Sequence, residues 1–378
     1  MSWSDNFNSL QNVLTRLNSN WPKLSLYNTQ LGEHPKKLAD LIANQAINRY
    51  QYFLQGVRSY QQHPYYRKKP VCQVVATEST SQVIYYSAAS PRAVLFWIPS
   101  LVNRGYILDL QPSNSFLRQL AGQGFSSLLL EWGDPTKLEY SFGLNEYMAR
   151  LLRLLSQTLP RFLRQPIYAA GYCMGGLFAL AAAQLTSCFK GVISLAAPWD
   201  FKVSQAPLTK VIQRHWPRWQ RLLPAGQPVP VELLQWYFSA LDPQQILQKF
   251  IKFAKTPLQS AAAEQFVALE DWLNDGVALP QNVLNECVQN WYQLNQPMLG
   301  KWQILGQIIQ PKSHKTPILA IIPTQDRIVP PASAAALAEN ARFVTLRHIE
   351  AGHIGMVTST RAAPQTIQAI TDWLGNNN

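Results

Sequence analysis

The sequence predicts an α/β fold, a mostly parallel central sheet with helices on both faces, from two observations. Short apolar runs alternate with helix-forming stretches along much of the chain, a pattern typical of strands joined by covering helices. One of these runs ends in a glycine-rich turn that leads directly into a second helix-forming run. With 378 residues, the chain is long enough for a sizeable core.

The expected elements follow one another in a regular order. Strands are expected at 82–86, 94–98, 127–131, 167–170, 192–196, 318–322 and 343–349, with helices at 113–122 and 144–158. Before residue 65 we expect an amphipathic helix, whose apolar stripe favours a packing face over a membrane or partner site. That stripe comprises Leu38, Leu41, Ile42, Ala46, Tyr50, Phe53, Leu54 and Val57.

The alternation breaks between residues 198 and 316, where Leu, Gln, Ala, Trp and Tyr are frequent and no clean buried strand is apparent. We expect a helical cap inserted into the core. Its aromatic residues either line an acyl path or form the cap's own core; they include Trp236, Tyr237, Trp272, Trp291 and Tyr292. The expected organisation is therefore an N-terminal helical segment and linker (1–70), core (71–197), cap (198–316) and core (317–378).

The glycine-rich turn reads Gly171-Tyr172-Cys173-Met174-Gly175-Gly176. A strand, a sharp turn and a helix in this order form the nucleophile elbow of an α/β-hydrolase, here with a cysteine at its apex. The glycines let strand and helix approach closely, the helix N-terminus favours a thiolate, and the Met174 N–H faces a developing oxyanion. Taken alone, the motif fits a small buried cysteine equally well.

An acid and a base are expected later in the chain, in that order. Asp326 follows the expected strand 318–322, and His353 lies in the loop after the last expected strand. We prefer His353 to the other five histidines because it alone lies in a loop directly after a strand. Asp200 also follows a strand and is the alternative acid, but Asp326 opens the segment that carries the histidine.

Four stretches together resemble the polyhydroxyalkanoate synthase family, α/β-hydrolase relatives that polymerise hydroxyacyl-CoA thioesters on a cysteine. The turn around Cys173 matches the family's cysteine lipase box. The segment from Pro99 to Leu110 resembles the family's Pro-Pro-x-Ile-Asn-Lys-x-Tyr-Ile-Leu-Asp-Leu, and Asp326-Arg327-Ile328-Val329-Pro330 and Gly352-His353-Ile354 resemble its acid and histidine motifs. The resemblance runs in order from about Val94 to the C-terminus.

The resemblance implies a cysteine-dependent acyltransferase. Cys173 is the expected nucleophile, His353 the base and Asp326 the residue that orients it, with the oxyanion held by backbone N–H groups of Met174 and of Val102 or Asn103. The chain departs from the family at Ser100, which replaces a proline, at Met174, and at Arg327, which replaces a common histidine.

Two other classes of function stay open. A thioesterase or polyester depolymerase would use the same three residues with water as the acceptor. An inactive paralogue would bind storage granules or synthase subunits through apolar surface. For the acyltransferase, the expected partners are a 3-hydroxyacyl-CoA substrate, the polyester product, a second copy or synthase subunit, and a granule surface.

Charge and cysteine content agree with this expectation. The net charge of +12 suits the phosphates of coenzyme A, whereas scattered basic residues and the absence of a known motif disfavour nucleic acid. The four cysteines lack metal-site spacing, so we expect no metal and no cofactor apart from the coenzyme A thioester as substrate. The chain shows no signal peptide and no apolar run of roughly 18 residues, and a cytoplasmic location is expected.

Overall fold

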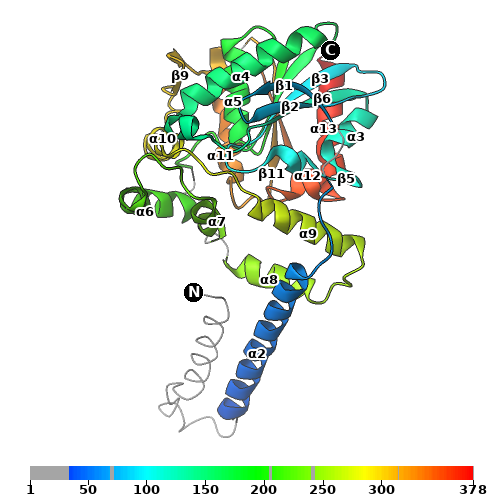
Figure 1. Ribbon diagram of the computed structural model, residues 1–378, viewed down its shortest axis with the longest axis vertical. Helices are drawn as coiled ribbons and strands as arrows, with labels where there is room; N and C mark the ends of the chain where they lie inside the picture. The colour runs from blue at the N-terminus through cyan, green and yellow to red at the C-terminus, as the bar shows by residue number, and fades with distance from the viewer. Residues whose placement is uncertain (1–33, 69–71, 204–206, 240–242, 314, 378) are drawn as a thin grey trace. The chain divides into compact units, whose positions relative to one another are not determined.

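The computed structural model describes residues 34–68, 72–203, 207–239, 243–313 and 315–377. Its centre is an eight-stranded sheet in the order β1-β2-β6-β3-β7-β8-β11-β12 (Figure 1). The six strands from β6 to β12 run parallel, and β1 and β2 pair antiparallel at one edge. The strands span Gln73–Glu78 (β1), Ser81–Tyr86 (β2), Ala93–Ile98 (β3), Phe125–Glu131 (β6), Ile167–Tyr172 (β7), Gly191–Leu195 (β8), Ile318–Pro323 (β11) and Val344–Ile349 (β12).

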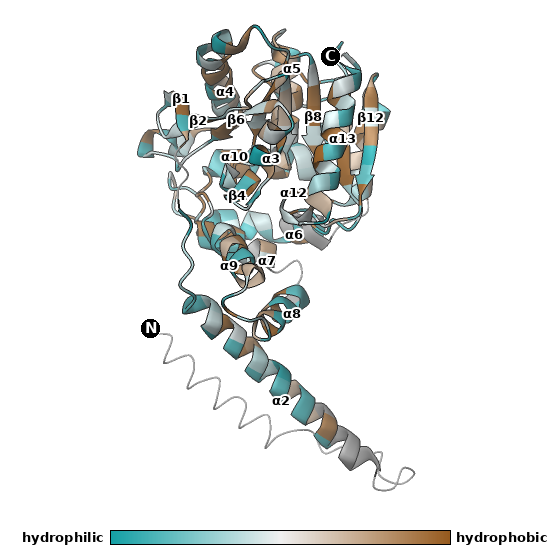
Figure 2. Cartoon of the chain, turned by 90° about the vertical axis from the view of Figure 1, so that its right-hand side faces the viewer, coloured by the Kyte–Doolittle hydropathy of each residue, from teal (hydrophilic) through white to brown (hydrophobic). Residues whose placement is uncertain are grey.

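Helices cover both faces of this sheet, as the sequence predicts. The helices α4 (Leu144–Thr158) and α5 (Met174–Leu185) pack on one face and bury one apolar cluster. On the other face, α3 (Phe116–Gly122), α12 (Gly355–Thr358) and α13 (Ala362–Asn376) bury a second. Figure 2 shows hydrophobic colour along β8, whereas the edge strand β12 also carries polar residues, among them the exposed Arg347 and His348.

The sequence misses the edge strand β1. Only Val75 of this strand is buried, and a register shift between Val74 and Ala76 interrupts its pairing with β2. A bulged edge strand loses the strict alternation that identifies strands in a sequence. The expected helix at 113–122 is also shorter, because Asn114 and Ser115 form the short strand β5 and Ser115 caps α3.

Between the core strands β8 and β11 the described chain is mainly helical. The helices are α6 (Pro207–Leu222), α7 (Val231–Ser239), α8 (Pro243–Phe253), α9 (Ala261–Asn274) and α10 (Gln281–Glu286), followed by a π-helix, η5 (Cys287–Gln293). A two-stranded hairpin of β9 (Gln303–Ile304) and β10 (Gln307–Ile308) also lies here, with Leu305 and Gly306 at positive φ in its turn. We refer to residues 207–239 and 256–313 as the inserted region.

Helix α2 (His34–Gln61) belongs to a second compact unit, whose described residues are 34–62 and Leu247–Lys255. Within this unit Phe53 packs edge-on against Phe250 at 5.9 Å, and Gly56 abuts the Phe250 backbone. The second half of the apolar stripe therefore serves as a packing face, whereas Leu41 near its start is 63% exposed. No helix in the described ranges is both long and apolar enough to cross a membrane.

Candidate active site

Cys173 lies at the junction between β7 and α5, where the chain turns sharply. Its φ of 55° and ψ of −127° are unusual for a residue with a side chain, and such a conformation costs about 1–3 kcal/mol. The turn is fixed by hydrogen bonds from the Cys173 N–H to the Leu195 carbonyl (2.8 Å) and from the Gly176 N–H to the Cys173 carbonyl (2.9 Å). Strain at one partly buried residue, held by its neighbours, is characteristic of a functional position.

The glycines of this turn are required by close packing. A Cβ atom on Gly171 would overlap the backbone of Gly175, and one on Gly175 would overlap the carbonyl groups of Ile98 and Pro99. The second overlap shows that the elbow abuts the loop that follows β3. This contact brings the motif around Cys173 beside the segment from Pro99 onward.

Asp326 and His353 form a buried pair. His353 Nδ1 donates to Asp326 Oδ2 at 2.6 Å, with side-chain exposures of 7% and 0%. The other oxygen, Asp326 Oδ1, accepts the backbone N–H groups of Ile328 (2.8 Å) and Val329 (2.9 Å). The alternative acid lies elsewhere: Asp200 Oδ1 accepts the Asn295 side-chain amide and two backbone N–H groups of its own loop.

Cys173 lies on the other side of His353. Burial lowers the pKa of His353, but the charge of Cys173 and hydrogen bonds to Asp326 and Cys173 outweigh it and raise the pKa to about 10. The imidazole therefore retains a proton when Cys173 is a thiolate. A proton-holding base between a nucleophilic atom and a buried carboxylate can take up and return one proton during a reaction.

Tyr172 is a functional neighbour that the sequence does not reveal. Its hydroxyl donates to the His353 backbone carbonyl at 3.1 Å, and its ring lies 5.1 Å from the imidazole. Burial raises the pKa of Tyr172 well above its usual value, so this hydroxyl stays protonated as a donor. Tyr172 thus fixes the histidine loop against β7, across a separation of 181 residues.

The expected oxyanion donors lie on both sides of the elbow. Met174 is the first residue of α5, so its N–H belongs to the helix end that has no intrahelical acceptor. The Val102 N–H donates to Ser100 Oγ at 3.3 Å, an acceptor that the family's proline would not supply. Asn103 forms an isolated antiparallel bridge with Gly276 of the inserted region.

The aromatic residues expected in the cap differ in burial: Trp236 is 57% exposed, and the side chain of Tyr237 lies outside the described residues. Trp272 and Trp291 are buried, and Trp291 packs on Phe201 and on Trp302. Tyr292, on the π-helix η5, is half-buried, and burial followed by the charge of Cys173 raises its pKa. Tyr292 is therefore the aromatic residue of this group that is electrostatically coupled to Cys173.

The remaining sequence candidates are less involved. Arg327 is exposed, although it follows Asp326 directly. All four cysteines are free, and burial raises the pKa values of Cys188 and Cys287. In the ranges that the structure describes, no three His, Cys, Asp or Glu side chains group together as metal ligands would.

Comparisons with known proteins agree with this fold. A poly(3-hydroxyalkanoate) polymerase subunit PhaC from Haloferax mediterranei is 26% identical, covering 80% of this chain and 63% of that protein. The PhaC subunit of Thiocystis violacea is 26% identical, and the match covers 79% of this chain and 87% of that protein. The PhaC subunit of Synechocystis is 27% identical, and the match covers 73% of this chain and 75% of that protein. The chain thus spans less than two thirds of the length of the Haloferax relative. The three similarities confirm the resemblance to polyhydroxyalkanoate synthases. Because residues 88–365 match the model of the alpha/beta hydrolase family, the chain belongs to this family.

Proposed function

We propose that this chain is an acyltransferase of the polyhydroxyalkanoate polymerase type, with Cys173 as its nucleophile. The observation that carries the proposal is the buried Asp326–His353 pair beside a cysteine in a strained elbow. The similarity to polymerase subunits supports the choice of acyl transfer among the reactions that this fold performs.

In the proposed first half-reaction, His353 takes the Cys173 proton and Asp326 stabilises the resulting imidazolium. The thiolate attacks the thioester carbonyl of a 3-hydroxyacyl-CoA. Its oxyanion is held by the Met174 N–H and by a backbone N–H near Val102 and Asn103. The bond to the coenzyme A sulfur then breaks, the leaving thiolate takes the proton from His353, and the acyl group stays on Cys173.

In the second half-reaction the hydroxyl of another hydroxyacyl group is the acceptor. His353 removes its proton, the oxygen attacks the acyl-Cys173 carbonyl, and a new ester forms as the Cys173 thiolate leaves. His353 then returns its proton to the sulfur. The same residues with water as the acceptor would make a thioesterase, so the outcome depends on how well the inserted region keeps water out.

The test is brief mixing of the purified full chain with 3-hydroxybutyryl-CoA, followed by mass spectrometry of the Cys173 peptide and product analysis. We expect mass increments of one or more hydroxybutyryl units on Cys173, together with released coenzyme A and ester-linked oligomers. Free 3-hydroxybutyrate, with never more than one unit on the protein, would instead favour the thioesterase. Complete lack of coenzyme A release would favour the inactive paralogue.

A further inference from the structure

An arginine-centred cluster joins the inserted region to the loop that follows β3. Arg104 Nη2 donates to both carboxylate oxygens of Asp134, at 2.8 and 2.9 Å, and its Nε donates to Asp275 Oδ1 at 3.3 Å. The Arg104 side chain is only 18% exposed, whereas Asp134 and Asp275 are 62% and 48% exposed. The arginine is thus nearly buried between one carboxylate of the core and one of the inserted region.

Hydrogen bonds to the backbone join the same two segments as this ion pair. The Val277 N–H donates to the Val102 carbonyl at 3.1 Å, and the Trp272 indole N–H donates to the Arg104 carbonyl at 2.8 Å. Gly276, which bridges to Asn103, has no room for a side chain because a Cβ would press on Val231. Residues 102–104 and 272–277 therefore form one hydrogen-bonded unit, although about 170 residues separate them in the chain.

This unit continues to the candidate nucleophile. The loop that contains residues 102–104 begins at Pro99, against which the elbow glycine Gly175 packs. On its other side the Gly105 N–H donates to Glu131 Oε2 at 2.9 Å, at the carboxyl end of β6. Residues 272–277 are therefore hydrogen bonded to the loop that carries the expected second oxyanion donor.

Arg104 supplies the positive charge of this unit. The carboxylates of Asp134, Asp275 and Glu131 all face its guanidinium, and the Tyr106 hydroxyl is also hydrogen bonded to Asp275. Without the arginine, Asp134 and Asp275 would lose the cation that both of them bind, and with it the ion pair that joins the two segments. Partly exposed partners make such a contact easy to open compared with a fully buried pair.

We propose that Arg104 is a positioning residue that holds segment 272–277 of the inserted region against the 102–104 loop and thereby fixes this loop as an oxyanion donor beside Cys173. This inference rests on the proposed function for its effect on catalysis. Its structural part, the docking of segment 272–277 on the 102–104 loop, does not depend on any substrate.

The structural part is tested by hydrogen exchange on the full chain. In Arg104→Gln we expect the Val277 amide, which bonds across to Val102, to exchange about two- to fivefold faster, the scale that an ion pair with exposed partners contributes. The Leu279 amide is the internal control, because its bond to Val229 at 3.2 Å lies within the inserted region. Arg153→Gln, which removes a surface pair with Glu78, is the matched control variant. Unchanged exchange at Val277, or equal acceleration at Leu279, would overturn the proposal.

The catalytic part is tested by turnover of 3-hydroxybutyryl-CoA. We expect Arg104→Gln to lower kcat by about tenfold or more, since small misplacements of catalytic groups are costly, and to raise the fraction of acyl groups released as free acid. Arg104→Lys should restore much of both, and Asp275→Asn should give a smaller effect that is not additive with Arg104→Gln. An unchanged kcat and free-acid fraction would overturn the positioning role. Absence of turnover in the wild-type chain would instead overturn the proposed function. The exchange rate of the Val277 amide would still show whether Arg104 holds segment 272–277 against the 102–104 loop.

Discussion

Two buried ion pairs of similar geometry lie in the core and differ in what they can do. Asp326 and His353 are 0% and 7% exposed, and Glu139 and Arg150 are each 3% exposed. Both pairs are shielded from water, and removing one partner of a buried pair is costly because it leaves the other charge uncompensated. The difference is the cation, because a histidine can give up its proton and an arginine cannot.

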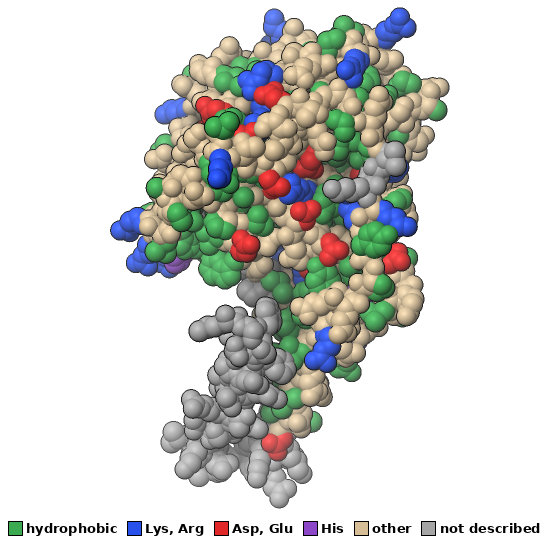
Figure 3. Space-filling view, viewed as in Figure 1, with side chains coloured by type: hydrophobic (Ala, Val, Ile, Leu, Met, Phe, Trp, Pro, Cys, Tyr) green, Lys and Arg blue, Asp and Glu red, His purple; other side chains and the backbone are tan. Residues whose placement is uncertain are grey.

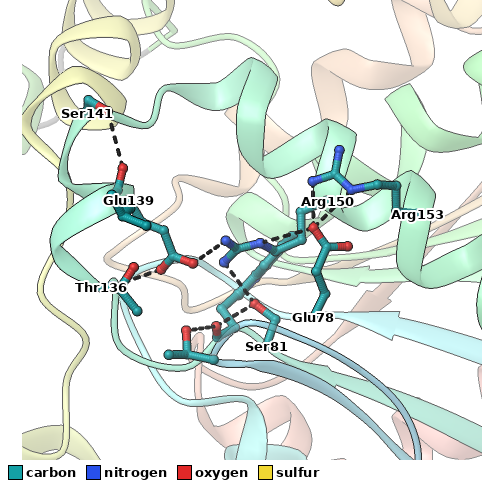
Figure 4. Close-up of polar contacts among 10 residues, drawn as sticks. Glu78, Ser81, Thr136, Glu139, Ser141, Arg150 and Arg153 are labelled. Atoms are coloured by element: carbon teal, nitrogen blue, oxygen red, sulfur yellow. Dashed lines mark hydrogen bonds and ion pairs between the residues drawn. The ribbon is translucent and has the colours of Figure 1, made fainter.

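The two pairs also differ in the groups that they contact. Arg150 also donates to Ser81 Oγ at 3.2 Å (Figure 4). Ser81 Oγ in turn donates to the Trp132 carbonyl at 2.6 Å. Burial raises the pKa of Glu139, but hydrogen bonds from Ser79, Thr136 and Arg150 outweigh it and lower the pKa. This cluster therefore fixes α4 to the antiparallel edge of the sheet. The Asp326–His353 pair faces Cys173 instead, so its hydrogen bonds can support a reaction.

The largest effect is expected at the nucleophile. Cys173→Ala should lower coenzyme A release from 3-hydroxybutyryl-CoA by about 10⁶-fold, the scale seen when an attacking residue is removed. The fold should persist, because the elbow glycines remain. Cys188→Ala is the control, since burial raises the pKa of the Cys188 thiol and makes it a poor nucleophile. If the Cys173→Ala chain released coenzyme A at nearly the wild-type rate, Cys173 would not be the nucleophile and the Asp326–His353 pair would have no catalytic role beside it.

The next effect concerns the carboxylate that orients the histidine. Asp326→Asn should lower turnover by about 10⁴-fold, as happens when the acid of such a triad is neutralised. Asp200→Asn should stay close to wild type, because Asp200 bonds Asn295 and its own loop and not His353. Steady-state rates of the two variants, measured side by side, decide the assignment. The reverse ranking would transfer the acid role to Asp200.

The arginine pair should affect stability and leave chemistry intact. Arg150→Met leaves the buried Glu139 carboxylate without its cation, which should cost about 3–5 kcal/mol of unfolding free energy. Glu139→Gln should cost less, because Arg150 stays within 4.0 Å of the Glu78 carboxylate. The double variant Arg150→Met with Glu139→Leu should lose less than Arg150→Met alone, because neither buried charge of the pair remains. Urea unfolding gives these values, and titration of active Cys173 corrects turnover for the folded fraction. A loss of turnover per folded molecule would contradict the assignment of a purely structural role to the Glu139–Arg150 pair.

Much of this site could be predicted because its signals are local. The residues of the elbow are contiguous, and Asp326 and His353 each lie in a loop directly after a strand. The choice of Asp326 over Asp200 rested on order along the chain, and the hydrogen bond from His353 supports it. Parallel strands end at one edge of the sheet, so residues that follow them converge.

The remaining features depend on contacts between distant residues. No short window of the sequence carries a pattern that would predict three of these contacts. They are the hydrogen bond from Tyr172 to His353, the ion pair of Arg104 with Asp275 and the salt bridge between Arg150 and Glu78. The stretch 198–316 was expected as one cap, yet Leu247–Lys255 pack with the N-terminal helix in a separate unit. Helical periodicity identifies an apolar face without identifying its partner. On the face in Figure 3, basic and acidic side chains are interspersed among the described residues, a mixture that total charge alone does not reveal.

The last prediction is a pH dependence of stability, at most about 1.4 kcal/mol for each pH unit, that distinguishes the two pairs. The pKa of His353 rises from its usual 6.5 to about 10 on folding. A raised histidine pKa contributes stability that is fully present below pH 6.5 and is lost as pH rises through 10, by up to about 1.4 kcal/mol per pH unit. His353→Gln should lower this slope in unfolding free energy between pH 6.5 and 10, leaving only the part that the raised pKa values of Cys188 and Cys287 contribute at the upper end. Cys173→Ala should also lower the slope, because the charge of Cys173 is the largest cause that raises the pKa of His353. Arg150→Met should retain the slope at lower overall stability, since an arginine does not titrate in this range. Equal slopes in the wild type and in His353→Gln, measured by urea unfolding at several pH values, would show that His353 does not hold its proton through this range.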